Sequence, residues 1–360
     1  MKITLFTFLF SLSVTFAFGQ LVGLNAREVN LLKTEINTDP EARRLYGTFK
    51  KAAADFLTEM PNPVDTIRTE GLLRGNPKKE RTSVALRDMN KMFTLALQFK
   101  LTGDTKYLNK ADEFLIAWAK VNHPNGDPID DTNLDKAIEA YDLIKDDISS
   151  ENKIVIADWL KNTALAEINS KRMNRNQGTG INNWNAHRLK VVGEIGYALN
   201  NQEFIDWTID RLKKHIEINL NEDGTSLDFK ERDAMHYHIY DLEPMLKLAL
   251  LIQRAGGENF YLYQSSKGSS IKKSVDWLIP YIKGEKQHEE YVNTKVKFDR
   301  DRAKNNEPGF APGTMFKPSL ALPVLKLSVY FDPKQLSLLK FLNEKANDWQ
   351  TLIDNIKQKK

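Results

Sequence analysis

Hydrophobic residues recur every three to four positions along most of the chain, which is the spacing of one face of an α-helix. The clearest run covers residues 81–100, and residues 107–121 repeat it after a turn at Gly103 and Asp104 that suits a helix end and a helix start. Strand-like alternation is scarce. The pattern predicts an all-α protein, with further helices at 27–35, 40–58, 134–146, 150–169, 182–199, 202–218, 232–254, 270–283 and 334–356.

The helices also repeat a common form, in which an apolar helix is followed by a tight polar turn, an aromatic residue and a second apolar helix. This form appears at residues 95–118 and 193–216, and a third copy begins at residue 248. Repeated antiparallel hairpins favour an (α/α) toroid, or incomplete barrel, around a central substrate cleft. An irregular helical domain is the alternative. No domain boundary is visible, so we expect residues 20–360 to form a single catalytic domain.

Residues 1–19 have a basic start, an apolar run and small residues near Ala17 and Gly19, which is typical of a secretory signal peptide. The run is too short for a stable membrane span. We therefore expect cleavage near Gly19, export to the periplasm or the medium, and no membrane anchor. The chain contains no cysteine, so the exported domain must depend on its core rather than on disulfides.

The net charge of +4 arises from charged residues of both signs that are mixed along the chain. A nucleic-acid-binding protein usually shows a denser basic stripe, so we expect no nucleic-acid partner. A mild positive balance suits an acidic substrate held in a local cationic site. We expect the protein to act as a monomer.

Cationic, histidine and tyrosine side chains are concentrated in residues 223–242, which hold two of the six histidines. In one continuous helix, Arg232, His236 and Tyr240 would share a face, and nearby cations would stabilise a tyrosinate. Packing of these rings in the core is the alternative. His236 and His238 are two positions apart and would point to different faces, which disfavours metal binding. We expect neither a metal nor a cofactor.

A second polar group lies at residues 182–188, with the sequence NNWNAHR. Asn183 and His187 are four residues apart and would share a helix face. An amide can bond a carboxylate without carrying charge, and a histidine can take a proton near neutral pH. A helix cap and a packed histidine are the alternatives. Acidic residues at Asp130, Asp131 and Glu139 could instead form the carboxylate pair of a glycosidase.

These stretches together resemble the alginate lyase superfamily of polysaccharide lyases. The resemblance covers about residues 40 to 305 and rests on residues 95–119, PIDDTNLDKAIEAYDLI (128–144), INNWNAHRLKVVGEIG (181–196), DGTSLDFKERDAMHYHIYDLEPM (223–245) and residues 278–303. It implies an α/α toroid that cleaves uronic-acid polymers by β-elimination.

The resemblance also implies roles for individual residues. Asn183 matches the asparagine that neutralises the uronate carboxylate, and Tyr237 matches the catalytic tyrosine. Trp184 stands where the family has a histidine, so His187 is expected to take its place. Lys230 aligns with a family arginine, and nearby Arg232 is the better donor. These departures point to a neighbouring alginate or glucuronan lyase family.

The expected function is cleavage of a polyuronate by β-elimination to give 4,5-unsaturated ends. Alginate containing mannuronate is the first choice, and glucuronan is the alternative. A protein that only binds acidic glycans, or a glycoside hydrolase, would be a different class. The expected catalytic residues are Tyr237, His187, Asn183 and Arg232. The expected binding residues for the anionic polysaccharide are Trp184, Lys230, His236, Tyr240, Arg188, His238 and Arg302.

Overall fold

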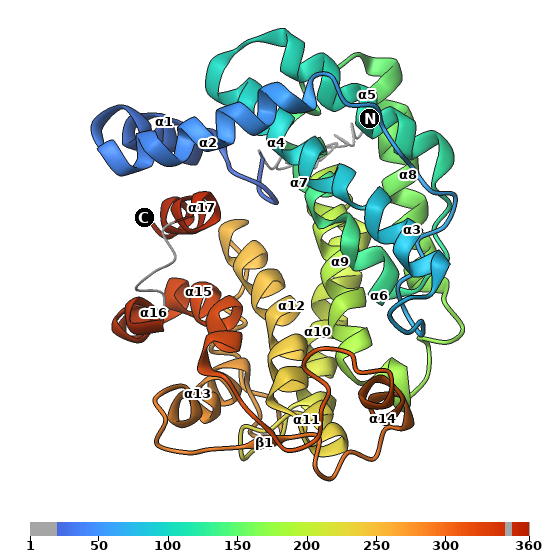
Figure 1. Ribbon diagram of the computed structural model, residues 1–360, viewed down its shortest axis with the longest axis vertical. Coiled ribbons are helices and arrows are strands. Elements are labelled where there is room, and N and C mark those ends of the chain that lie inside the picture. The colour runs from blue at the N-terminus through green and yellow to red at the C-terminus, as the bar shows by residue number, and fades with distance from the viewer. Residues whose placement is uncertain (1–19, 343–347, 360) are drawn as a thin grey trace, which may run out of the picture.

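The computed structural model describes residues 20–342 and 348–359, and the predicted signal peptide, residues 1–19, lies outside this part (Figure 1). The α-helices are α1 (Ala26–Thr38), α2 (Pro40–Phe56), α3 (Pro77–Ala85), α4 (Arg87–Thr102), α5 (Thr105–Val121), α6 (Pro128–Asp131), α7 (Asp135–Ile144), α8 (Ser150–Asn169), α9 (Asn183–Leu199), α10 (Gln202–Asn219), α11 (Leu227–Arg232), α12 (Met235–Arg254), α13 (Ile271–Ile282), α14 (Lys297–Lys304), α15 (Leu322–Phe331), α16 (Leu336–Leu342) and α17 (Trp349–Gln358).

Short elements complete the fold. The 3₁₀ helices are η1 (Thr132–Leu134), η2 (Gly178–Gly180), η3 (Pro318–Ala321) and η4 (Pro333–Gln335). Strands β1 (Glu289–Glu290) and β2 (Thr314–Met315) pair antiparallel, with Glu289 opposite Met315 and Glu290 opposite Thr314. No helix in residues 20–342 and 348–359 combines the length and apolar character needed to cross a membrane.

Local sequence explains where several helices begin and end. Asn25 and Glu28 form a reciprocal capping box at the start of α1. Gly103 ends α4 in the left-handed conformation, with φ of 75°, and the Asp104 side chain accepts a hydrogen bond from the second residue of α5. Because a glycine has no Cβ, it adopts this conformation without the steric cost that other residues meet. The predicted turn between these two helices is confirmed.

Other boundaries differ from the sequence expectation. The expected helix 81–100 is divided into α3 and α4 at Leu86, and the expected helix 334–356 contains η4, α16 and α17 instead. Helices α14 and α15 lie in regions for which no helix was expected. The expected helix 232–254 begins later, because Asp233 adopts the left-handed conformation, with φ of 50°, and ends α11. Arg232 therefore belongs to a different helix from His236 and Tyr240.

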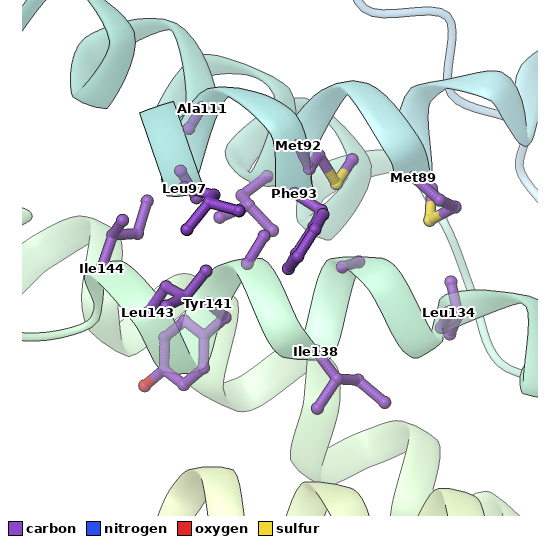
Figure 2. Close-up of a cluster of buried hydrophobic side chains, with 14 of the residues drawn as sticks. Met89, Met92, Phe93, Leu97, Ala111, Leu134, Ile138, Tyr141, Leu143 and Ile144 are labelled. Atoms are coloured by element: carbon purple, nitrogen blue, oxygen red, sulfur yellow. The ribbon is translucent and has the colours of Figure 1, made fainter. Parts of the chain in front are cut away.

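Two hydrophobic cores meet at α9. The first is built from α1, α2, α4, α5, α7 and α8, and Figure 2 shows part of it, where Phe93 and Leu97 of α4 point toward α7 and Leu143 of α7 points toward α4. The second is built mainly from α10, α12, α13 and α15. Helix α9 contributes side chains to both cores and is buried along almost its whole length. It therefore holds the two halves of the molecule in fixed positions.

Helices α9 and α12 pack against each other through the middle of the molecule (Figure 1). Helices α4, α5, α7 and α8 lie on one side of this pair, α13 and α15 lie on the other, and α17 returns to contact α1 and α2. This arrangement of helix hairpins is the α/α toroid fold, which confirms the predicted fold class. Residues of the two central helices make up most of the candidate site.

Candidate active site

The first turn of α12, which carries Tyr237, is held by a residue far away in the sequence. Ala234, at the helix start, has no side chain that could cap it. The carboxyl of Glu290 in β1 instead accepts the backbone N–H groups of Met235, at 3.0 Å, and His236, at 3.2 Å. Burial raises the pKa of Glu290 to about 7. The β1 segment therefore fixes the position of the helix turn that presents Tyr237.

Two guanidinium groups surround Tyr237. Arg302 in α14 donates a 2.6 Å hydrogen bond to the Tyr237 hydroxyl, and the Arg232 guanidinium lies 3.7 Å from the ring centre. Arg232 is in turn paired with the buried carboxylate of Asp299. Burial raises the pKa of Tyr237 above its ordinary value, while Arg232 and Arg302 act in the opposite direction because they stabilise the phenolate. A phenol between two cations can gain and lose a proton at the same atom.

Aromatic rings connect Tyr237 with α9. Tyr240 lies one turn further along α12, and its ring centre is 6.2 Å from that of Tyr237 and 4.3 Å from that of His187. The His236 ring stacks parallel to Tyr240 at 6.3 Å. Burial, followed by the charges of Arg302 and Arg232, lowers the pKa of His236 to about 4. His236 is therefore a neutral, partly exposed ring at neutral pH.

His187 on α9 is held by Thr132 of η1. The Thr132 hydroxyl lies 2.9 Å from Nδ1 of His187, and the Lys190 ammonium donates to the same hydroxyl at 2.8 Å. Since an ammonium only donates, the hydroxyl accepts from Lys190 and finds a partner for its own proton in Nδ1. Burial, followed by the positive charge of Lys190, holds the pKa of His187 well below its usual range. The neutral ring then carries its proton on Nε2, which is buried.

Asn183 lies one turn before His187, at the start of α9. The buried carboxyl of Asp228 in α11 accepts its backbone N–H at 2.8 Å and also its side-chain amide. Asn219 donates to the same carboxyl at 3.2 Å. Burial raises the pKa of Asp228 to about 7, helped by the nearby Asp241. Asp228 therefore fixes the orientation of the buried Asn183 amide.

Three of the expected binding residues lie elsewhere. Lys230 is exposed and pairs with Asp223 at 3.3 Å. The buried Arg188 donates to the main-chain oxygens of Glu167 and Ile168 and so holds the turn after α8. The fully buried His238 uses both ring nitrogens within the protein, one at 3.0 Å from the Ser226 hydroxyl and the other at 3.1 Å from the Ser274 carbonyl. Their positions fit structural roles.

Trp184 is almost fully buried beside Asn183, and the guanidinium of Arg172 lies 4.0 Å from its ring centre. Arg172 also pairs with Asp127 at 3.3 Å. Burial, followed by the charge of Asp130, raises the pKa of Asp127 to about 6. Trp184 therefore supports a half-exposed arginine rather than offering its own ring face to solvent.

Sequence reasoning missed the residues that hold the catalytic candidates in place. Asp228 and Asp299 were visible as acids within the motifs, but nothing in the sequence showed that they would bind Asn183 and Arg232. Thr132 follows the acidic pair at 130–131, and nothing in the sequence indicates its contact with His187. Glu290 gave no local signal, because it caps a helix that begins 55 residues earlier. Among residues 20–342 and 348–359, no group of three histidines and acids could hold a metal ion.

Comparisons with known proteins identify the family of the chain. The family model described as alginate lyase matches residues 33–288, and the chain belongs to that family. An alginate lyase from Bacteroides ovatus has a similar structure, with a TM-score of 0.70, 19% identity, and coverage of 93% of this chain and 98% of that one. No curated protein matches the chain at a significant level.

The alginate lyase A1-III from Sphingomonas species A1 is also similar, with a TM-score of 0.57, 21% identity, and coverage of 75% of this chain and 80% of that one. Two variants of that enzyme, one with a histidine replaced by alanine and one with a tyrosine replaced by phenylalanine, were solved in complex with a tetrasaccharide. Each has a TM-score of 0.57 and 20% identity to this chain, covering 75% of it and 78% and 80% of the respective relative.

Proposed function

We propose that the protein is a polysaccharide lyase that cleaves alginate by β-elimination, with Tyr237 as the group that transfers the proton. The observation that carries the proposal is the hydrogen bond from Arg302 to the Tyr237 hydroxyl, together with the Arg232 guanidinium over the Tyr237 ring. Membership of the alginate lyase family supports the reaction class. The tetrasaccharide complexes of the Sphingomonas enzyme support a carbohydrate polymer as substrate.

The reaction breaks the C5–H and C4–O4 bonds of a uronate and forms a C4=C5 double bond. The C5 proton is too weakly acidic to leave unless the adjacent carboxylate is neutralised, because negative charge builds on that group in the transition state. The amide of Asn183 and the Nε2–H of His187 are the donors proposed for this carboxylate. Arg232 is paired with Asp299 and lies against the Tyr237 ring, so its proposed role is to stabilise the phenolate.

In mannuronate the C5 proton and O4 leave from the same face of the sugar ring. One group can therefore take the proton from C5 and deliver it to O4, and Tyr237 is proposed to do both as phenolate and then as phenol. The proton count balances, because the C5 proton ends on the departing oxygen, which becomes the anomeric hydroxyl of the new reducing end, while the other product carries the unsaturated uronate. Guluronate presents the two groups on opposite faces, so the same site predicts a preference for mannuronate blocks.

The direct test is to incubate the protein with polymannuronate, polyguluronate and glucuronan and to follow the ultraviolet absorbance of the unsaturated product. We expect the fastest rise with polymannuronate. Equal or faster cleavage of glucuronan would make that polymer the substrate, since its C5 proton and O4 also lie on one face. No absorbance with any polymer, together with tight binding, would favour a glycan-binding protein, and new reducing ends without absorbance would favour a hydrolase.

We also propose that residues 1–19 direct export, because their basic start and apolar run are typical of a signal peptide. Expression of the full chain followed by mass measurement of the exported protein tests this. The mature protein is expected to begin near residue 20. Recovery of only the full-length chain inside the cell would contradict the proposal.

A further inference from the structure

The segment between α2 and α3, residues 57–76, is attached at two distant places. Near its middle, the carboxylate of Asp130 in α6 accepts the backbone N–H and the hydroxyl of Thr69, both at 2.7 Å. Near its end, the backbone N–H of Arg74 donates to Oε1 of Glu307 at 2.7 Å, and the Asn305 amide donates to the Arg74 carbonyl at 3.1 Å. The segment therefore joins the α6 region to the residues that follow α14.

The same glutamate faces the arginine that binds Tyr237. Oε2 of Glu307 lies 3.7 Å from Nε of Arg302, while another nitrogen of that guanidinium donates to the Tyr237 hydroxyl. The Glu307 side chain is only 7% exposed and that of Arg302 is 19% exposed. The guanidinium also contacts the rings of Phe298 and Phe310, at 4.4 and 4.6 Å. The Arg302 guanidinium thus lies against two aromatic rings, with the Glu307 carboxylate near Nε and the Tyr237 hydroxyl at Nη1.

We propose that Glu307 is a positioning residue that couples the 57–76 segment to the hydroxyl of Tyr237 through Arg302. The inference rests on the proposed lyase function only for its catalytic consequence. The two carboxylate oxygens of Glu307 have different partners. Oε1 accepts the backbone N–H of Arg74, and Oε2 faces the Arg302 guanidinium. A carboxylate that is fixed at one oxygen cannot turn freely, so the segment determines where the negative charge stands beside Arg302.

The physical basis is the geometry of the guanidinium group. Its five donors are fixed in one plane, so an anion that attracts Nε from 3.7 Å favours one orientation of that plane and of the remaining nitrogens. If the 57–76 segment moves away, Oε1 loses its 2.7 Å Arg74 donor and keeps the longer 3.3 Å bond from Asn305, so the carboxylate is held less firmly. Arg302 then loses its fixed anion, and its hydrogen bond to Tyr237 is no longer held at 2.6 Å. Small displacements of this kind reduce catalysis strongly.

Two variants of Glu307 separate the two tasks. Glu307→Gln keeps an oxygen that can accept the Arg74 N–H but removes the charge beside Arg302. Glu307→Ala removes both interactions. Glu285→Gln is the matched control, because it removes one negative charge from an exposed position that lies 3.7 Å from Lys283. Each variant is compared with the wild-type chain for kcat and KM on polymannuronate.

We expect Glu307→Gln to lower kcat about tenfold while KM stays within about twofold, because the segment remains attached and only the ordering of Arg302 is lost. Glu307→Ala is expected to lower kcat at least as much and also to raise KM. The control keeps wild-type values. If Glu307 only fastened the 57–76 segment, its replacement would change KM and leave kcat as in the wild type. A wild-type kcat in Glu307→Gln would therefore overturn the coupling.

Hydrogen exchange of the Arg74 amide tests the attachment without any activity assay. We expect protection in the wild type and in Glu307→Gln, and loss of protection in Glu307→Ala while the α9 amides stay protected. Unchanged protection in Glu307→Ala would overturn the attachment. If the wild type cleaves no polyuronate, the proposed function fails while this exchange result still decides the structural part of the inference.

Discussion

Arg302 and Tyr237 lie 65 residues apart in the sequence, yet the guanidinium of one donates a 2.6 Å hydrogen bond to the hydroxyl of the other. The contact brings α14, for which the sequence predicted no helix, to the first turn of α12. Arg232 reaches the same tyrosine from α11 and faces its ring. The cationic surroundings of the candidate catalytic group on α12 therefore come from two other helices, α11 and α14.

Replacement of Tyr237 by phenylalanine removes the hydroxyl and leaves the ring packing. We expect kcat on polymannuronate to fall by about 10² to 10⁴, which is the usual contribution of a positioned acid or base. Tyr281→Phe is the control, since that ring packs against Trp277 away from Arg302. A fully active Tyr237→Phe enzyme would exclude Tyr237 from the mechanism and leave Tyr240 as the next candidate.

The pH dependence of the reaction reports which form of Tyr237 is needed. Burial raises its pKa above the ordinary value of about 10, so the phenolate is the minor form at neutral pH. If the phenolate takes the C5 proton, kcat/KM rises with pH, by up to about tenfold per unit, from neutral into the alkaline range. The measurement is a pH profile with short assays in which the protein stays folded. A rate that falls over this range would assign Tyr237 as an acid only.

Arg302→Lys keeps the positive charge but loses the planar set of donors. A lysine ammonium cannot bond Tyr237 and face Glu307 in the same fixed geometry. We expect kcat to fall by about tenfold or more, with little change in the midpoint of thermal unfolding. Arg300→Lys is the matched control, because Arg300 lies on the same helix, is exposed and donates to the Thr294 carbonyl. Equal kinetic effects of the two substitutions would contradict the assigned contact.

The proton position on His187 predicts different outcomes for two amide substitutions. The amide nitrogen of glutamine can take the place of Nε2, whereas that of asparagine lies closer to the place of Nδ1. If His187 donates through Nε2–H, His187→Gln should retain more activity than His187→Asn or His187→Ala. The comparison is made by kcat/KM on polymannuronate. Equal loss in all three variants would instead support His187 as a base, because no amide can accept the proton.

The raised pKa of Asp228 makes it a pH-dependent element of stability. The folded value is about 7, and the unfolded value is the ordinary one near 3.9. Between these values the folded state binds the extra proton, so the contribution of Asp228 to stability is full below about pH 4 and is lost as pH rises to about 7. The loss is about 1.4 kcal/mol per unit of pKa difference. Urea unfolding should show this decline in the wild type.

Asp228→Asn removes the titrating group and tests this assignment. Its free energy of unfolding should decline less steeply between pH 4 and 7 than that of the wild type, because an amide does not ionise in this range. Parallel curves for the two proteins would show that the pKa of Asp228 is not raised on folding. Asp210→Asn is a suitable control, since Asp210 is an exposed carboxylate paired with Lys214.

Much of the fold could be read from the sequence, because apolar spacing is a local property. The helices that correspond to α5, α8, α9 and α10 were expected within a few residues, and the toroid followed from the repeated hairpins. The expectation that Arg232, His236 and Tyr240 share one helix was wrong. A single left-handed residue, Asp233, separates α11 from α12, and aspartate gives only a weak sequence signal for such a break.

The sequence by itself determined which chemical groups are available. It contains an asparagine and a histidine one turn apart on α9, and a tyrosine near cations in residues 223–242. The tertiary structure decided how these groups are oriented and charged. Asp228 holds Asn183, Thr132 orients His187, and Arg302 binds Tyr237. Each partner is more than forty residues away, so only the packing of the helices brings the pairs together. Burial in that packing, with the charges that it brings near, shifts the pKa values of Tyr237, His187 and Asp228.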